Sequence, residues 1–244
     1  MKNFWRIVDK VINESDIVLM ILDARHIEET RNVELEQKVA SAKKQLITVI
    51  NKADLVEKDL LEPYKQKFHP CVFVSAQKFY GMTMLRHMIL RYAESFPVMV
   101  GVVGYPNTGK SSVINALKGK SSAAVSSASG FTKGQQNIRV DNKIMVIDTP
   151  GVIAGSDDKS SEKLKVTASM NVKQDPDLAA YELIKIYKKI IAEFYGVDYE
   201  GLSEEEILES IAIKLNRFIK GGEPDIDTAA RIILQDWQKA KIQV

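Results

Sequence analysis

Residues 98–111 read Val98-Met-Val-Gly-Val-Val-Gly-Tyr-Pro-Asn-Thr-Gly-Lys-Ser111, and they are the most informative part of the sequence about its structure. An apolar run of the kind that forms a buried strand leads into Gly104-Tyr-Pro-Asn-Thr-Gly-Lys-Ser111, which fits the pattern G-x-x-x-x-G-K-[ST]. Residues 112–117 continue with helical character. In such a loop, glycines let backbone N–H groups turn toward phosphate oxygens, and the helix N-terminus adds its positive end. The stretch therefore predicts a nucleoside triphosphate site between a strand and a helix.

The positions of this loop have distinct expected roles. Lys110 is expected to reach the β- and γ-phosphates, and the Ser111 hydroxyl is expected to ligate Mg²⁺. The nucleotide-binding residues predicted in the loop are Asn107, Thr108, Gly109, Lys110, Ser111 and Ser112. A glycine-rich turn that binds nothing is the plainer alternative, but the strand and helix on either side count against it.

Composition indicates a soluble globular protein. The chain has 244 residues, of which 45% are hydrophobic and 27% charged, enough for one or two domains with a real core. The longest apolar runs are too short to span a bilayer, and the N-terminus lacks a signal-peptide pattern, so we expect a cytoplasmic protein with no membrane contact. The single cysteine, Cys71, cannot form an internal disulfide, and burial in its apolar run is the preferred interpretation.

Charge is distributed unevenly along the chain. The net charge is +2, but residues 156–244 carry −4 and the first 155 residues carry +6. Any broad attraction to polyanions is therefore expected from the N-terminal part.

The first 150 residues alternate apolar runs with helical patterns. Strands are expected at residues 16–22, 45–50, 72–75, 98–103, 138–140 and 143–147, and helices at 3–13, 33–44, 58–68 and 82–96. Asp141-Asn142 predicts a hairpin between the last two strands. This alternation indicates an α/β fold with a mostly parallel sheet covered on both faces, in which ligands bind at the carboxyl ends of strands.

The composition changes after residue 155. Residues 155–165 are polar, and three helices are expected beyond them, the first with Asp175 and Pro176 at its start and the second with the capping box Ser203-Glu-Glu-Glu206. Gly221-Gly222 is expected to end the second helix. The buried stripes are expected at Leu183, Tyr187, Ile190 and Phe194, at Ile207, Ile211, Leu215 and Phe218, and at Ala230, Ile233 and Trp237. The sequence thus predicts three parts: residues 1–155, a linker or switch segment at 156–170, and a small all-α domain at 171–244.

Three further motifs turn the triphosphate site into a predicted GTPase. Asp148-Thr-Pro-Gly151 fits D-x-x-G, in which the aspartate holds Mg²⁺ and the Gly151 N–H meets the γ-phosphate. Asn51-Lys-Ala-Asp54 fits N-K-x-D, and its carboxylate suits the N–H donors of guanine but leaves adenine unmatched. Ser75-Ala76 fits the loop whose backbone N–H meets guanine O6.

A serine- and glycine-rich stretch, residues 121–134, is expected to be a mobile loop. Within it, Thr132 is the best candidate for the threonine that completes the Mg²⁺ site and senses the γ-phosphate. The catalytic residues are therefore predicted to be Lys110, Thr132 and Gly151, and the Mg²⁺ ligands Ser111, Thr132 and Asp148. Outside the phosphate loop, the predicted nucleotide-binding residues are Asn51, Lys52, Asp54, Ser75, Ala76 and Gly151.

The order of these motifs is reversed relative to ordinary small GTPases, because the base-reading motifs come first. In this order, the chain resembles the circularly permuted GTPases of the YlqF/YawG type, which act in large ribosomal subunit assembly. Asp23-Ala-Arg25 resembles the family's strand-end D-A-R, and Gly104 to Ser112 resembles its P-loop. Lys220-Gly-Gly-Glu-Pro-Asp225 and residues 227–242 resemble the C-terminal signature of its larger relatives. The resemblance implies a P-loop NTPase G domain in circularly permuted order, followed by a helical domain.

Hydrolysis is expected to be slow without a stimulus. Val152 stands where Ras-like GTPases place a water-orienting glutamine, and it can neither donate nor accept a hydrogen bond. Related GTPases with asparagine at the position of Asn107 use its side chain to hold K⁺ near the transferring phosphate. K⁺ activation through Asn107 and a purely loop-capping role for Asn107 both stay open.

Some features depart from the family pattern. Met1–Arg6 lacks the N-terminal histidine segment of bacterial members, and Ser129 replaces a usual proline. His26, His69 and His87 lie on no motif, and loop or helix-surface positions are expected for them.

Two functions remain open from the sequence. The first is a GTP switch, expected to be monomeric, that docks on rRNA or on a precursor of the large ribosomal subunit and leaves after hydrolysis to GDP. The second is a GTP-dependent switch for a protein partner without RNA, which the −4 charge of the helical domain favours. The basic groups Lys185, Lys188 and Lys189, and Arg217 and Lys220, are either RNA contacts or solvated helix faces. An ATP-dependent kinase or motor is excluded by Asp54.

Overall fold

The computed structural model describes residues 2–105, 107–119, 136–148, 176–239 and 241–242. Two compact units are present, Met1–Lys159 and Ser160–Val244, and each is described by itself. Thr132, Gly151, Val152 and the predicted segment 156–170 lie outside the described residues, as do the side chain of Asp148 and the proposed mobile loop at 121–134. The division into parts at 155 and 170 therefore stays a prediction.

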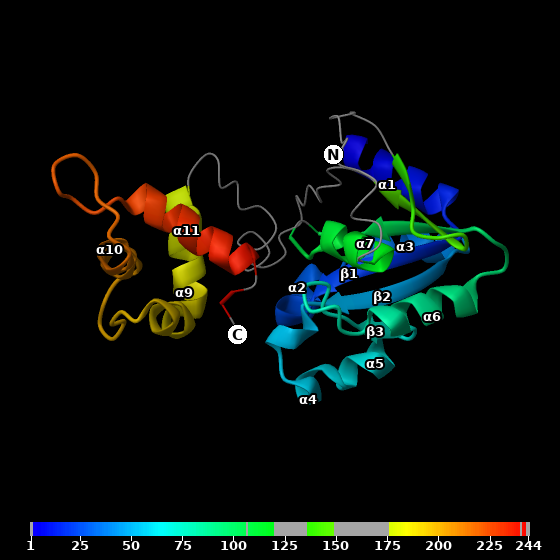
Figure 1. Cartoon of the computed structure of the whole chain (residues 1–244), viewed down its shortest axis with the longest axis horizontal. Coiled ribbons are helices and arrows are strands. Elements are labelled where there is room, and N and C mark those ends of the chain that lie inside the picture. The colour runs from blue at the N-terminus through cyan, green and yellow to red at the C-terminus, as the bar shows by residue number, and fades with distance from the viewer. Residues whose placement is uncertain (1, 106, 120–135, 149–175, 240, 243–244) are drawn as a thin grey trace. The chain divides into compact units, whose positions relative to one another are not determined.

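The first unit is built on a six-stranded sheet with the order β3-β2-β1-β4-β6-β5 (Figure 1). The strands are β1 Ile17–Asp23, β2 Gln45–Asn51, β3 Cys71–Phe73, β4 Val98–Val103, β5 Gln136–Arg139 and β6 Ile144–Asp148. All neighbouring pairs are parallel except β5 and β6, which form the predicted hairpin. The mixed, mostly parallel α/β sheet predicted from the sequence is confirmed.

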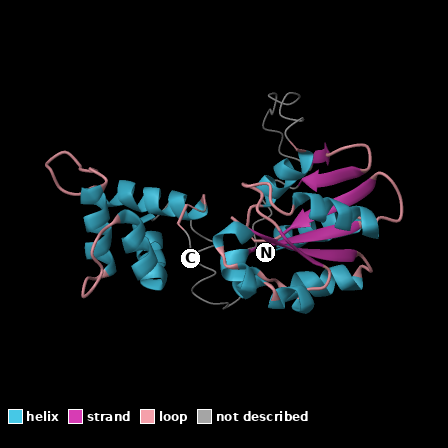
Figure 2. Ribbon diagram, turned by 60° about the horizontal axis from the view of Figure 1, so that its bottom comes forward, coloured by secondary structure: helices cyan, strands magenta, loops and turns pink. Residues whose placement is uncertain are grey.

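Helices cover both faces of this sheet (Figure 2). They are α1 Lys2–Glu14, α2 Ile27–Thr30, α3 Val33–Ser41, α4 Lys58–Leu61, α5 Pro63–Lys67, α6 Met82–Tyr92 and α7 Lys110–Lys118, with 3-10 turns η1 Ala24–His26 and η2 Ala53–Leu55. Successive side chains of a strand point to opposite faces, and β1 shows this clearly. Ile17, Leu19 and Ile21 pack with α6 and α7, whereas the alternate residues of β1 pack with α1 and α3. Both faces of β1 are buried, which explains its unbroken apolar sequence.

Gly101 in β4 allows α1 to lie close to the sheet. A Cβ atom at this position would stand 2.7 Å from Val11 Cγ1 and 3.0 Å from Ser15 Oγ. Ser15 ends the helix by donating its hydroxyl to the Val11 carbonyl at 2.8 Å. Asp16 then joins the sheet, because its carboxylate accepts the Met99 N–H at 2.8 Å.

The described part of the second unit contains α9 Pro176–Tyr195, α10 Glu204–Lys214 and α11 Ile226–Gln238, whose buried faces form one core. The predicted capping box at the start of α10 is present, with Ser203 and Glu206 each bonding the other's backbone N–H. Asp225 caps α11 by accepting the Thr228 N–H at 3.0 Å. Ala230, Ile233 and Trp237 are buried as predicted.

Several predictions from helical spacing are wrong. Helix α9 has a non-helical residue at Tyr187, which shifts the buried stripe onto Ile191 and Tyr195 and leaves Phe194 exposed. Helix α10 ends at Lys214, before Gly221-Gly222, so Phe218 lies in the following loop and is 48% exposed. The periodicity continued in the sequence, but the chain reverses at Asn216, which adopts a left-handed conformation with φ 51°.

Other differences are smaller. The helix expected at 82–96 ends at Tyr92, and the one expected at 58–68 is divided into α4 and α5 where Pro63 begins a new turn. His69 and His87 are exposed as expected, but His26 is buried because the turn η1 folds it against the first unit's core. Cys71 is partly buried, and burial raises the pKa of its thiol to about 12, so it is unreactive as predicted. Throughout the described ranges, every helix is too short or too polar to cross a bilayer.

Candidate functional site

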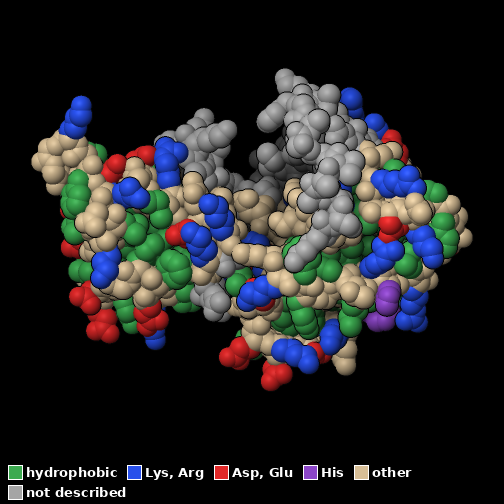
Figure 3. Space-filling model, viewed as in Figure 1, with side chains coloured by type: hydrophobic (Ala, Val, Ile, Leu, Met, Phe, Trp, Pro, Cys, Tyr) green, Lys and Arg blue, Asp and Glu red, His purple; other side chains and the backbone are tan. Residues whose placement is uncertain are grey.

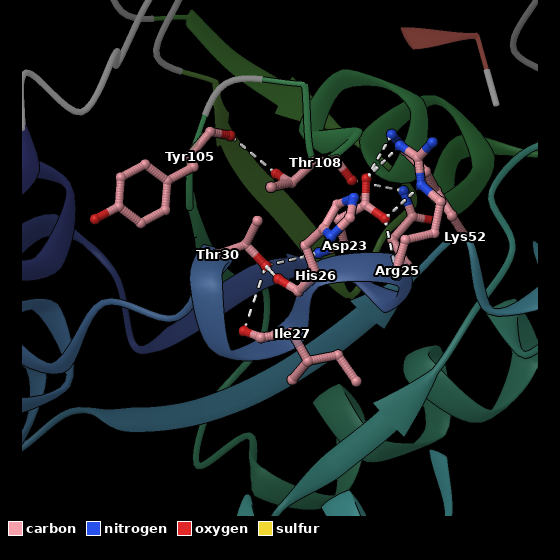
Figure 4. Close-up of polar contacts among 9 residues, drawn as sticks. Asp23, Arg25, His26, Ile27, Thr30, Lys52, Tyr105 and Thr108 are labelled. Atoms are coloured by element: carbon pink, nitrogen blue, oxygen red, sulfur yellow. Dashed lines mark hydrogen bonds and ion pairs between the residues drawn. The ribbon is translucent and has the colours of Figure 1, made fainter. Parts of the chain in front are cut away.

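The phosphate loop joins β4 to α7 at the carboxyl edge of the sheet. Gly104 has φ 143°, and a Cβ atom there would stand 2.5 Å from the carbonyl oxygen of Ile21, so only glycine fits. Thr108 is buried and donates its hydroxyl to the Tyr105 carbonyl at 2.9 Å (Figure 4). Ser111 and Ser112 lie exposed in the first turn of α7. The loop thus presents hydroxyl groups and a helix N-terminus to the solvent.

Lys110 lies folded back into this loop. Its ammonium donates to the carbonyl oxygens of Gly104 at 2.9 Å and Tyr105 at 2.6 Å. Burial lowers the pKa of Lys110 to about 8. The ammonium is therefore held where a phosphate oxygen would compete with two carbonyl oxygens for it.

Asn51 connects the phosphate loop to the third strand's loop. Its amide Nδ2 donates to the Thr108 carbonyl at 2.9 Å, and its Oδ1 accepts the Ala76 N–H at 3.1 Å. The side chain is buried, and a Cβ atom at Gly109 would stand only 2.2 Å from Nδ2. One side chain at the end of β2 thus brings together two loops that lie 25 and 57 residues away in sequence.

Asp54 lies in η2 beside the loop that follows β3. Its carboxylate forms an ion pair with Lys78 at 3.2 Å. Burial alone would raise the pKa of Asp54, but hydrogen bonds from Ser75 and Lys78 outweigh it and lower the pKa. The Ala53 N–H donates to the Val74 carbonyl at 3.0 Å, which joins the two loops through their backbones. Asp54 is thus an ionised acceptor at this edge.

A second polar cluster surrounds Asp23 at the end of β1 (Figure 4). Arg25 donates Nε to Asp23 Oδ1 at 3.0 Å and a terminal nitrogen to Oδ2 at 2.8 Å. The Lys52 ammonium lies 2.7 Å from Oδ2. Burial alone would raise the pKa of Asp23, but the hydrogen bonds and charge of Arg25 and the charge of Lys52 hold it well below its ordinary value.

The structure brings the predicted residues of the first unit together at one edge, as far as they are described. Asn51 contacts the phosphate loop directly, and Asp54 lies against Ser75 and Lys78. The ion pairs of Lys78 with Asp54 and of Asp23 with Lys52 were not predicted from the sequence. Parallel pairing of β1 with β2 would have indicated the pair of Asp23 with Lys52, because it sets Asp23 opposite Asn51, the residue before Lys52.

Comparisons with known proteins agree with this arrangement. A model of the RsgA GTPase family matches residues 10–155, and one described as 50S ribosome-binding GTPase matches residues 99–213. A GTP-binding protein of Methanocaldococcus jannaschii is 42% identical across 97% of this chain and 65% of its own length. The nuclear/nucleolar GTPase 2 of rice is 33% identical across 99% of this chain and 47% of its own length. The chain thus spans about half to two thirds of these relatives.

A solved structure shares the fold. GNP-bound YlqF from T. maritima superposes with a TM-score of 0.63 at 24% identity, over 97% of this chain and 94% of that one. The RsgA GTPase model covers more than half of the chain, and the motifs stand in permuted order around one sheet edge. The chain therefore belongs to the RsgA GTPase family, and it is a circularly permuted GTPase.

Proposed function

We propose that the first unit binds GTP and GDP with Mg²⁺ and hydrolyses GTP to GDP and phosphate. The observation that carries this proposal is a pair of hydrogen bonds of the Asn51 side chain, which donates Nδ2 to the Thr108 carbonyl and accepts the Ala76 N–H at Oδ1. They join the predicted base-reading loops to the phosphate loop, although these segments are far apart in sequence. A purine nucleotide can therefore contact all three loops at once.

Base selection is assigned to Asp54, whose ionised carboxylate suits the N1–H and N2–H₂ donors of guanine. The Ser75-Ala76 loop lies beside it, and the Ala76 N–H is bonded to Asn51 in this structure. If the Ala76 N–H also contacted guanine O6, it would be shared between two acceptors, Asn51 Oδ1 and that oxygen. Lys52 is the remaining predicted residue of this loop, and its ammonium is paired with Asp23.

The residues proposed for Mg²⁺ fit this ion chemically. Ser111 is exposed at the start of α7, and Thr132 and Asp148 add a hydroxyl and a carboxylate, all hard oxygen donors of the kind that Mg²⁺ prefers. When bound, Mg²⁺ would neutralise charge on the phosphates. Lys110 would move from the loop carbonyls to the phosphates, and the Gly151 N–H would meet the γ-phosphate.

We propose slow intrinsic turnover that a partner or K⁺ stimulates, because Val152 offers no polar group to the attacking water. Asn107 is exposed at the loop surface, and its side-chain amide oxygen is a donor that K⁺ could use. GTP hydrolysis is expected to be faster in K⁺ than in Na⁺, and Asn107→Ala is expected to abolish this difference. Equal rates of GTP hydrolysis by the unmodified protein in K⁺ and in Na⁺ would exclude K⁺ as the stimulus.

We further propose that the GTPase acts as a switch in large ribosomal subunit assembly, as a cytoplasmic monomer. The match to 50S ribosome-binding GTPases and the nucleolar names of several relatives support this role. In the second unit, the loop after α10 exposes Arg217 and Lys220 on either side of Phe218 and Ile219. Basic and aromatic side chains together suit RNA phosphates and unpaired bases.

The alternative is a GTP switch for a protein partner without RNA. Acidic side chains gather at one edge of the helical unit on the face drawn in Figure 3, and Glu204, Glu205 and Glu206 form the first turn of α10. Such a surface would repel RNA.

Co-sedimentation with large ribosomal subunits separates the two functions. The protein is compared with a non-hydrolysable GTP analogue, with GDP and without nucleotide. Binding that depends on the GTP analogue supports the ribosomal switch. Absence of binding in all three states would contradict it and favour a protein partner.

A further inference from the structure

Lys52 is one of the predicted nucleotide-binding residues, but Asp23, which pairs with it, and Arg25, which pairs with Asp23, have no part in the function proposed so far. We propose that Asp23, fixed by Arg25, is a positioning residue of the guanine site that acts through Lys52. This inference rests on the proposed binding of guanine nucleotides. It assigns a role in ligand affinity to two residues that need not contact the nucleotide themselves.

The Asp23 carboxylate is held in a single orientation. Arg25 contacts both of its oxygens, at 3.0 and 2.8 Å, and the Arg25 N–H also donates to Oδ1 at 3.1 Å. Only 6% of the Asp23 side chain and 2% of the Arg25 side chain are exposed. A two-point contact with a planar guanidinium fixes a carboxylate more strictly than a single contact does. Oδ2 is thereby directed at Lys52.

Lys52 needs such a partner for two reasons. Its backbone is left-handed, with φ 62° and ψ 30°, which is unfavourable for a residue with a Cβ atom. Its side chain is only 11% exposed, and burial lowers the pKa of the ammonium, an effect that the charge of Asp23 opposes. The ion pair at 2.7 Å therefore stabilises both the charge of Lys52 and its unusual backbone conformation.

The conformation of Lys52 sets the positions of its neighbours. Asn51 precedes it and makes the bonds to the phosphate loop and to Ala76. The Lys52 carbonyl accepts the Leu55 N–H at 3.0 Å and so closes the turn that carries Asp54. Because Asp23 lies opposite Asn51 in the β1–β2 ladder, the carboxylate supports this loop from the adjacent strand.

A purely stabilising role explains the cluster less well. Burying ion pairs costs desolvation, and well-packed apolar side chains often stabilise a fold as much or more. All three residues of the cluster lie at the carboxyl edges of β1 and β2, next to the loops predicted to hold the ligand. A charge network next to these loops is better explained by the need to hold ligand-binding residues in fixed positions.

The test compares GDP affinity, measured with a fluorescent GDP, among four variants of the full chain: Asp23→Asn, Lys52→Met, the double variant and a matched control. Glu36→Gln is the control, because Glu36 in α3 also accepts two bonds from an arginine, Arg31, at 2.7 and 2.8 Å. Thermal unfolding is recorded in parallel to find a temperature at which all variants are folded.

Asp23→Asn is expected to raise the dissociation constant for GDP about tenfold or more, and Glu36→Gln is expected to leave it unchanged. In the Lys52→Met background, Asp23→Asn is expected to cause no further loss of GDP affinity, because the ammonium through which Asp23 acts is already absent. An unchanged affinity of Asp23→Asn, or an equal loss in both backgrounds, would overturn the proposal.

Arg25→Lys is the variant to use if Asp23→Asn does not fold. It keeps the charge but loses the two-point contact, so a several-fold weaker affinity for GDP is expected. Unchanged affinity would overturn the proposal here too. Failure of the unmodified protein to prefer GDP over ADP would refute the proposed function. Equal, normal GDP binding by Asp23→Asn and the unmodified chain would refute only the role of Asp23.

Discussion

At the scale of single residues, Lys110 predicts a coupling between nucleotide binding and protons. Burial lowers its pKa from 10.5 to about 8, whereas a phosphate ligand favours the charged ammonium. Binding of GDP above pH 8 is therefore expected to take up a proton and to weaken as pH rises. Calorimetry in two buffers with different ionisation enthalpies measures this uptake. The matched variant Lys110→Arg does not titrate in this range and is expected to show none.

The lowered pKa of Lys110 also determines how its contribution to the stability of the fold changes with pH. Between pH 8 and 10.5 the unfolded chain holds more protons on Lys110 than the folded protein does. The contribution of Lys110 to the free energy of unfolding therefore rises with pH across this window and is least favourable below it. Urea unfolding of the nucleotide-free protein, compared with Lys110→Met, measures the difference.

Asp54 predicts a change of base preference. In Asp54→Asn, the amide can donate to the extra carbonyl of xanthine but no longer matches both donors of guanine. The ratio of affinities for GDP and XDP is expected to shift toward XDP by about tenfold or more. The variant also loses the ion pair with Lys78, but Lys78 is 60% exposed, so that loss is small. Lys78→Gln is the control, and an unchanged ratio in Asp54→Asn would refute the base site.

The sequence indicated which residues form the site better than how they contact one another. Motif spacing and strand ends predicted Asn51, Asp54 and the phosphate loop at one edge. The bridging role of Asn51 depends on the distance between the ends of β2 and β4, which are separated by β1. The pairing of Asp23 with Lys52 depends on register, which local sequence does not determine.

At the scale of elements, periodicity predicted the helices but not their ends. Of the stripe expected on α9, Leu183 is buried and Tyr187 and Ile190 pack half-buried against the core. The prediction fails at Phe194, since the non-helical Tyr187 changes the face that later residues present. Phe218 continues the spacing of α10, yet it lies in a loop where Ile219 donates its N–H to the Glu223 carbonyl at 2.9 Å. Both predictions fail where the backbone leaves helical geometry, which periodicity alone does not reveal.

The packing of α1 on β4 gives a prediction at this scale. Gly101→Ala places a Cβ atom 2.7 Å from Val11 Cγ1, which is buried and has a stiff, branched side chain. The free energy of unfolding is expected to fall by about 1–3 kcal/mol, as measured by urea denaturation. Adding Val11→Ala removes the colliding methyl group, so the double variant is expected to lose less stability than the sum of the two single variants. Strict additivity would show that the collision does not exist.

At the scale of the whole molecule, the permuted order decides which segment comes after the phosphate site. Strand β6 is parallel to β4, so it ends at the same edge of the sheet as the phosphate loop. The next described element is α9, which begins the core of the helical unit. In a GTPase of ordinary motif order, the base-reading strands would come at this point instead. The segment between Asp148 and Pro176 therefore links the proposed γ-phosphate contact at Gly151 directly to the second unit.

This connection predicts that the protease accessibility of the linker depends on whether GTP or GDP is bound. If Gly151 contacts the γ-phosphate, the residues after it are expected to change their accessibility between a GTP analogue and GDP. Trypsin cleavage at Lys159, Lys163 and Lys165 is expected to differ between the two states, as followed by mass spectrometry. Cleavage at the exposed Lys220 in the helical unit serves as an internal control and is expected to stay constant. Equal cleavage of the linker in both states would mean that the γ-phosphate is sensed elsewhere, and the permuted order would then have no role in signalling.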